Sequence, residues 1–304
     1  MRCAGLAVVL VASTALAQPY LRTRALSNTG NSELCVTWSV RKLTYRQDAA
    51  GSSRTPVEAE FTAVDNAFAA WQALARGCSD FEFVRGPRIA DAGVGKGTGD
   101  DNVIMFREEN CRDVVPLADP CQTDSSCGNK HRCWEHGDAT IALTTSTYST
   151  RTGVVFDSDI EFNAGKSADG TRFLFTTISS PPCSEGMETP FCTAYDIQNT
   201  ATHEIGHMVG FDHVTEPSST MAPTAPLADL QKRVIDPGTA SGFCGTYPRG
   251  KPPVPCDELA QLKSRITARN TGTLGCTCQA PSGVGLLPLV GLWALGRRRR
   301  SEAR

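Results

Sequence analysis

One segment constrains this chain more than any other: it runs from His203 to His213 and reads H-E-x-x-H-x-x-G-x-x-H. Residues four apart lie on one face of an α-helix, so His203 and His207 can bind the same ion. Gly210 can take the left-handed conformation that ends a helix, which lets the chain turn back and bring His213 to that ion. Three imidazoles leave a fourth position for water, which is typical of a catalytic zinc site.

The residue beside the first histidine completes this chemistry, because Glu204 is placed to take a proton from the bound water. An apolar stripe lies roughly opposite the histidines, as expected for a helix between a core and a metal: Ile197, Ala201, Ile205 and Met208. The alternative is a buried helix with incidental histidines. It is disfavoured because three of the five histidines in the chain fall in this window at the required spacing.

These residues resemble the motif of the metzincins, a clan of zinc endopeptidases. The clan carries a methionine turn beneath the metal, and the segment 218–223 (S-S-T-M-A-P), with Met221, is similar to it in the style of the matrixin branch. Pro223 stands where the astacin branch has a tyrosine, and Val214 where matrixins usually have serine or threonine. The resemblance covers about residues 31–250 and points to bacterial matrixin-like proteins.

The resemblance implies an α+β fold with a twisted mixed five-stranded sheet, a long backing helix, an active-site helix and a closing C-terminal helix. Periodicity predicts strands over 35–45, 81–84, 102–106, 139–145 and 154–163, and an amphipathic helix over 56–75. The closing helix of the family usually starts with two adjacent aspartates. Gly238 and Thr239 stand at those positions, and Asp236 lies earlier.

In matrixins the strand that corresponds to 139–145 is the sheet edge above the cleft. We therefore expect an extended substrate peptide to pair with Ile141, Ala142 and Leu143. The mechanism implied is attack of a zinc-bound water on a peptide carbonyl, with Glu204 moving the proton to the leaving amine. The rival functions are a catalytically silent zinc-binding surface adhesin on the same fold and a disulfide-stapled interaction protein without metal.

The sequence also bears on two further metal sites, a structural zinc site and a calcium site. Animal matrixins carry a structural zinc, but Leu143 and Val155 stand at the matching histidine positions, so we expect one catalytic zinc and no structural zinc of that type. Asp157 and Asp159 could bind calcium; the alternative is that they are solvated charges at a strand end. The net charge of −2 gives no reason to expect a nucleic-acid partner, and we expect a monomer that acts on proteins or peptides.

Both ends of the chain indicate export. Arg2, an apolar run over 6–11 and the small-x-small sequence at 15–17 predict a signal peptide over 1–17. A short segment (18–30) and the catalytic domain (31–250) follow, with a cysteine-rich insertion at 111–133, and then a linker (251–275). The tail (276–304) combines cysteines, an apolar stretch over 284–295 and four arginines, and resembles MYXO-CTERM sorting tails; a simple C-terminal anchor is the alternative. We expect the protein to be located at the cell surface, in the outer envelope or outside the cell, and to contact the membrane only through this tail.

Ten of the 13 cysteines lie between the signal peptide and the tail, and an even number in an exported chain predicts disulfides. A second zinc site made of cysteines is the alternative, but these ten contain no paired C-x-x-C arrangement. Connectivity does not follow from sequence; as working guesses we take Cys35–Cys78, Cys183–Cys192 and Cys244–Cys256.

Overall fold

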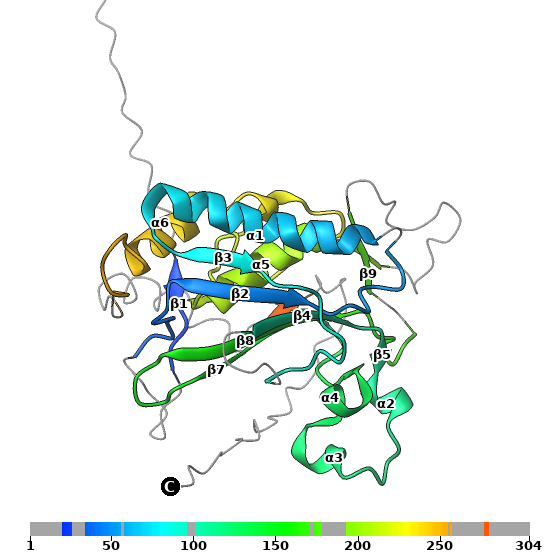
Figure 1. The fold of residues 1–304 in the computed structure, drawn as a ribbon. Coiled ribbons are helices and arrows are strands. Elements are labelled where there is room, and N and C mark those ends of the chain that lie inside the picture. Colours follow the sequence, from blue (N-terminus) through cyan, green and yellow to red (C-terminus); the bar gives the residue numbers. More distant parts are fainter. Residues whose placement is uncertain are drawn as a thin grey trace, which may run out of the picture.

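The centre of the protein is a mixed β-sheet (Figure 1). The computed structural model describes residues 20–25, 34–55, 58–95, 101–170, 173–177, 193–254 and 256, and residues 277–279 by their backbone. The strand order is β12-β7-β8-β4-β2-β3. The bounds are Lys42–Gln47 for β2, Glu82–Arg85 for β3, Asp101–Arg107 for β4, Thr140–Tyr148 for β7, Val155–Asn163 for β8 and Thr277–Gln279 for β12.

The predicted mixed five-stranded sheet is confirmed. Strands β3, β2, β4 and β8 run parallel, and β7 pairs antiparallel with β8. β7 is therefore the edge of the domain's own five strands. The short strand β12, which comes from the C-terminal tail, adds antiparallel to that edge and makes a sixth strand.

The long backing helix is α1, Ala59–Cys78. It follows the predicted apolar spacing, because Phe61, Val64, Phe68 and Trp71 are all buried. α1 lies on the same side of the sheet as α5, Ile197–Met208, which contains the first two histidines of the motif (Figure 1). The indole N–H of Trp71 donates to the carbonyl of Thr202 at 2.9 Å, so the backing helix is bonded directly to the histidine helix.

The strand predicted over 35–45 begins later than expected, at Lys42. The alternation that suggested it is real, since Val36 and Trp38 are buried. However, Cys35 and Thr37 make single bridges to other segments instead of joining the sheet ladder. The alternating burial therefore comes from an extended segment that makes isolated bridges and is not part of a strand of the central sheet.

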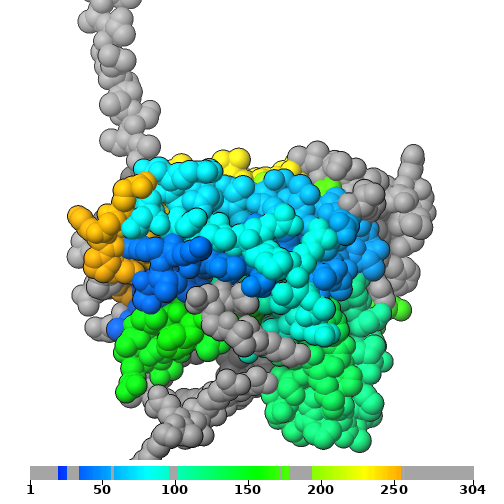
Figure 2. Space-filling view, viewed as in Figure 1, coloured from blue at the N-terminus to red at the C-terminus, as the bar shows by residue number. Residues whose placement is uncertain are grey.

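The predicted cysteine-rich insertion protrudes from the body as a group of short elements (Figures 1 and 2). These are β5 (Glu109–Asn110), α2 (Cys111–Val114), α3 (Cys121–Asp124), α4 (Cys127–His131) and β6 (Cys133–Trp134). Disulfides Cys111–Cys133 and Cys121–Cys127 close it. Because the insertion has a core of its own made largely of cysteines, it is held together by these bonds.

Two of the guessed disulfide pairs are wrong. Cys35 pairs with Cys256, and Cys78 pairs with Cys244. Cys78 is the last residue of α1, and the closing helix α6 (Pro237–Thr246) packs against α1 and brings Cys244 to it. Proximity along the chain is therefore the wrong criterion for these cysteines. The third guess, Cys183–Cys192, lies outside the described residues.

Two further short pairings involve strands outside the central sheet and the insertion. Strand β1 (Leu21–Arg22) runs antiparallel to β11 (Phe211–Asp212), and β9 (Phe173–Thr176) runs parallel to β10 (Thr193–Asp196). Within the part of the chain that the structure describes, no helix has the length and apolar character needed to span a bilayer. The predicted signal peptide, and the tail apart from β12, lie outside that part.

Candidate metal centre

The histidine helix α5 has a well-defined start. Asp196 is its N-cap, and its carboxylate accepts the backbone N–H of Asn199 at 2.7 Å. The same carboxylate is bound by the guanidinium of Arg233, whose Nε donates to Oδ1 at 2.7 Å. Arg233 ends the 3₁₀ turn η2 (Gln231–Arg233), so the segment after the methionine turn is fastened to the first turn of the helix.

The end of α5 depends on Gly210, as the sequence predicts. Its φ is +92°, and a Cβ there would lie 2.4 Å from the carbonyl oxygen of Val36. Side chains from distant segments satisfy the last carbonyls of the helix: Trp38 donates to Met208 at 2.7 Å and Tyr247 donates to Val209 at 2.9 Å. The chain turns sharply here and returns towards its own helix.

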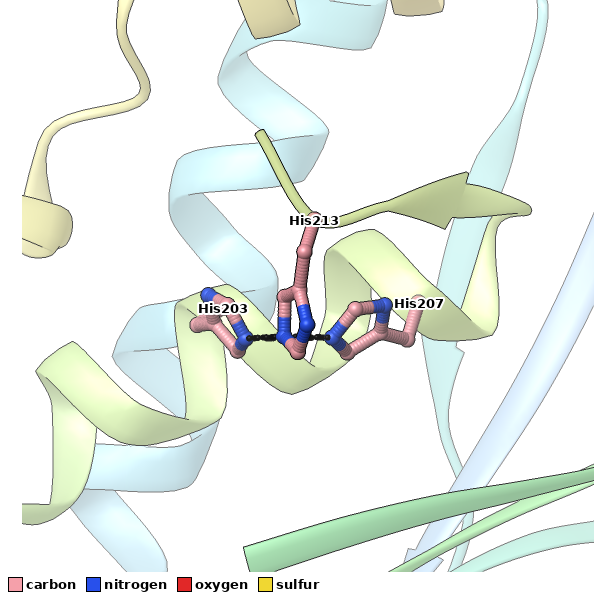
Figure 3. A group of neighbouring side chains, drawn as sticks. All are labelled: His203, His207 and His213. Atoms are coloured by element: carbon pink, nitrogen blue, oxygen red, sulfur yellow. Dashed lines mark hydrogen bonds between the residues drawn. The ribbon is translucent and has the colours of Figure 1, made fainter. Parts of the chain in front are cut away.

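This turn brings His213 to His203 and His207 (Figure 3). The Nε2 atoms are 3.0 Å apart between His203 and His207, and each is 3.1 Å from Nε2 of His213. Nitrogens bound to one zinc ion at 2.0–2.1 Å in a tetrahedral site lie about 3.3 Å apart. The three side chains of the predicted metal site are therefore together, at nearly the separation that a zinc ion requires.

Backbone carbonyls orient two of these rings. The Nδ1 of His203 lies 2.6 Å from the carbonyl oxygen of Thr220, and the Nδ1 of His207 lies 2.7 Å from that of Phe211. A carbonyl only accepts, so each Nδ1 carries the proton and each Nε2 offers a lone pair. Such lone pairs pointing at one spot repel each other unless a cation lies between them, so this donor set fits a zinc ion.

All three imidazoles are held in their neutral form. Burial lowers the pKa of His207 to about 4. Burial also lowers the pKa of His203 well below its ordinary value, and the positive charge of Lys232 adds to that effect. The pKa of His213 is likewise well below its ordinary value, first because of burial and then because of neighbouring His207. Neutral imidazole is the form that binds metal.

Glu204 is fully buried beside the histidines and is held by the edge strand. The hydroxyl of Thr144, on β7, donates to its Oε2 at 2.6 Å. The residues expected to bind substrate, Ile141, Ala142 and Leu143, lie on the same strand. Strand β12 pairs with this stretch, with Cys278 opposite Ala142 and Thr277 opposite Leu143. The edge thus accepts an antiparallel strand at the expected residues.

Met221 lies fully buried under the histidine helix and packs against Gly206. A Cβ at Gly206 would lie 2.3 Å from its sulfur and 3.4 Å from the ring of Trp71. The N–H of Val214 donates to the carbonyl of Met221 at 3.0 Å, which ties the methionine turn to the residue after His213. The side chain of Met221 therefore occupies the space that a side chain at Gly206 would need.

Asp236 sets the start of the closing helix, ahead of Gly238 and Thr239, which stand where the family usually has two aspartates. Asp236 is the N-cap of α6, because Pro237 is favoured at the first helical position. Its Oδ1 accepts the N–H of Gly238 at 2.8 Å, and its Oδ2 accepts the N–H of Thr220 at 2.8 Å. The same carboxylate therefore caps the helix and fixes the methionine turn.

The carboxyl groups considered for calcium have different environments. Asp159 accepts the N–H groups of Gly95 and Val103 at 2.7 and 2.8 Å, so it braces a loop and strand β4. The side-chain oxygens of Asp157 are buried, and its carboxyl group interacts with that of Asp159. Burial raises the pKa of both groups. A second cluster, Asp119, Cys121 and His131, is no metal site because Cys121 is in a disulfide.

Three residues that contact the candidate metal centre or its methionine turn lie outside the histidine motif, and the motif does not predict them. Thr144 binds Glu204, Asp236 binds the methionine turn, and Lys232 lies behind His203. The alternation of the edge strand could have suggested a residue such as Thr144, since it predicts which side chains face the helix. Asp236 is marked only by its place ahead of the two positions where the family has aspartates, and nothing in the local sequence marks Lys232.

The chain is similar to a known protein family. The model of the family described as Matrixin matches residues 37–237, which is more than half of the 304-residue chain. The matched region includes the three histidines, Glu204 and Met221. No curated protein matches the chain.

Proposed function

Because the chain belongs to the matrixin family, we propose that it is a zinc-dependent endopeptidase. The observation that carries the proposal is the convergence of three neutral Nε2 atoms, within 3.1 Å of one another, beside the buried carboxylate of Glu204. We assign His203, His207 and His213 as the zinc ligands and Glu204 as the general base. A site that only bound zinc would need no acid at that position.

A zinc ion at this site supplies Lewis acidity and a bound water with a pKa near 7. The residues of the chain position the remaining groups. Thr144 holds one oxygen of Glu204, so that the carboxylate keeps one orientation when it takes the proton of the water and passes it to the leaving amine. Met221 moves no proton; it packs beneath the histidine helix and keeps its position.

The substrate we propose is a peptide in extended form. The edge of β7 offers backbone groups to an antiparallel strand, and Thr144 on that strand connects it to Glu204. A peptide on this edge would lie beside the general base. Strand β12 pairs with the same residues, so a substrate would replace it there.

We also propose that the protein is exported, and that its tail attaches it to the cell surface or is cut to release it. Support comes from the four disulfides, since such bonds persist in oxidising compartments. The mass of the protein isolated from the producing cells tests this. Cleavage after Ala17 is expected, and a mass that retains residues 1–17 would contradict it.

Calcium remains a separate proposal, which Asp157 supports more than Asp159 does, because the oxygens of Asp159 already accept backbone N–H groups. Calcium should raise the melting temperature of the protein, and the Asp157→Asn variant should show a smaller rise. Equal shifts in both proteins would count against a site at Asp157.

The proposed function is tested by cleavage of a mixed peptide library, with zinc content measured on the same samples. The comparison is wild type against Glu204→Gln, which keeps the shape of the side chain. We expect both to hold one zinc and the variant to lose about 10²- to 10⁴-fold in kcat. If both hold zinc and neither cuts, the endopeptidase proposal fails and the silent adhesin replaces it. If neither holds zinc, the assignment of the histidines is wrong.

A further inference from the structure

Lys232 is a buried lysine directly behind a zinc ligand. It is 2% exposed, and its Nζ donates to the carbonyl of Ala222, in the methionine turn, at 2.5 Å. The same Nζ lies 3.4 Å from Nδ1 of His203. That Nδ1 already donates to Thr220, so the ring offers the ammonium no acceptor in the form that binds metal.

Among the residues that the structure describes, the charge of this ammonium has no counter-ion nearby. Among the described residues, no aspartate or glutamate lies within ion-pair distance of Lys232, although eight other lysine or arginine residues there form such pairs. A buried charge without a partner is costly, and proteins usually pair it or replace it with an apolar residue. Its positive charge is therefore uncompensated where it faces the metal centre.

The backbone keeps Lys232 in this place. Its N–H donates to Oδ1 of Asn199, in the first turn of α5, at 2.6 Å. The next residue, Arg233, binds the N-cap Asp196 through both oxygens. Since η2 is fastened to the histidine helix at two points, the ammonium stays beside His203.

We propose that Lys232 is a positioning residue that acts through His203 and places a positive charge behind the metal centre. This inference rests on the proposed zinc site. A positive charge near a zinc ion opposes binding of the ion, but it stabilises negative charge that develops on an oxygen bound to it. Lys232 thus weakens zinc binding and favours the transition state for hydrolysis.

The sign of the effect on zinc affinity separates this role from a merely structural one. We would compare wild type with Lys232→Met, which keeps the length of the side chain without its charge, and with Lys232→Arg, which keeps the charge. Lys42→Met, at an exposed position of β2, controls for the loss of a lysine. Zinc affinity is measured by competition with a chromophoric chelator.

Lys232→Met should bind zinc about tenfold more tightly than wild type, because a repulsive charge has gone. Its kcat should fall by about tenfold with little change in KM. Lys232→Arg and Lys42→Met should bind zinc as wild type does. A scaffold damaged by the loss of the bond to Ala222 would bind zinc more weakly instead.

A Lys232→Met protein that binds zinc no more tightly than wild type overturns the proposal. If that variant does not fold, Lys232→Gln decides in the same way, because its side chain is also uncharged but keeps an amide donor. The outcomes are distinct from those for the proposed function. A wild type that binds no zinc refutes the metal site itself, whereas a wild type that binds zinc and cuts, with unchanged affinity in the neutral variants, refutes the role of Lys232 alone.

Discussion

The hydroxyl of Thr144 donates to Oε2 of Glu204 at 2.6 Å, and the same hydroxyl oxygen lies 3.0 Å from the backbone carbonyl of Glu204. Thr144 belongs to the edge strand β7 and Glu204 to the histidine helix α5, so one contact joins the proposed substrate strand to the proposed general base. A hydroxyl that donates to a carboxylate forms a strong bond of fixed direction.

Replacing Thr144 with valine removes this bond while keeping the shape of the side chain. We expect kcat to fall by about 10- to 100-fold, which corresponds to the loss of a hydrogen bond to a charged group. KM and zinc content should stay close to those of wild type, and Thr144→Ser should restore most of the rate. Steady-state kinetics on one peptide check this; equal rates for valine and serine would refute a role for the hydroxyl.

Gly206→Ala should destabilise the protein although alanine favours helices. The new Cβ would lie 2.3 Å from the sulfur of Met221, and overpacking of this kind costs about 1–3 kcal/mol. Gly245→Ala is the matched control, because this exposed helical glycine has no atom within 4 Å of a new Cβ. Urea unfolding should show a lower free energy of unfolding for the first variant and no loss for the second.

The buried pair of Arg107 and Glu161 should make stability depend on pH. Their Nε and Oε1 atoms are 2.6 Å apart, and His136 contacts the other carboxylate oxygen at 3.2 Å. Burial alone would raise the pKa of Glu161, but the bond with His136 and the charge of Arg107 outweigh burial and lower it from 4.5. The stability that the carboxylate contributes is therefore present above pH 4.5 and is lost as the pH falls below it.

Glu161→Gln leaves the guanidinium buried without its counter-charge, so we expect a loss of about 3–5 kcal/mol at pH 7. Below pH 4.5 the difference from wild type should shrink, since wild type then loses the same charge. Denaturant unfolding at pH 7 and at several acidic values measures this. A constant difference across that range would contradict the prediction.

Digestion without reduction should yield peptides that link Cys35 to Cys256 and Cys78 to Cys244. Replacing both Cys78 and Cys244 with alanine should lower the free energy of unfolding by about 2–5 kcal/mol, because the bond closes a long loop. Recovery of a linked Cys35–Cys78 peptide would show that the pairing is different.

Strand β12 should compete with substrate for the edge of β7. Thr277→Pro combined with Gln279→Pro removes two backbone N–H groups from β12, so the full-length variant should show a higher kcat/KM on short peptides, by several-fold. Thr271→Pro, outside β12, serves as the control. Unchanged kcat/KM in the double variant would mean that β12 does not hinder access.

The sequence alone determined the features that lie within one element. Two histidines four residues apart share a helical face, Gly210 ends that helix, and alternating or helical spacing locates most of the sheet and α1. These inferences hold because the geometry of a helix or strand depends on residues a few positions apart. They were sufficient to single out the three histidines of the proposed zinc site and Glu204.

Only the tertiary structure decided which elements meet. Thr144 reaches Glu204 across 60 residues of chain, and Lys232 reaches His203 across 29. Asp236 binds the methionine turn, and Cys78 pairs with Cys244 rather than with Cys35. Periodicity indicates which face of an element is apolar, but not which other element covers it. The residues that surround the candidate metal centre reach it from elements distant in the sequence. Only the packing of the folded chain therefore shows which residues these are.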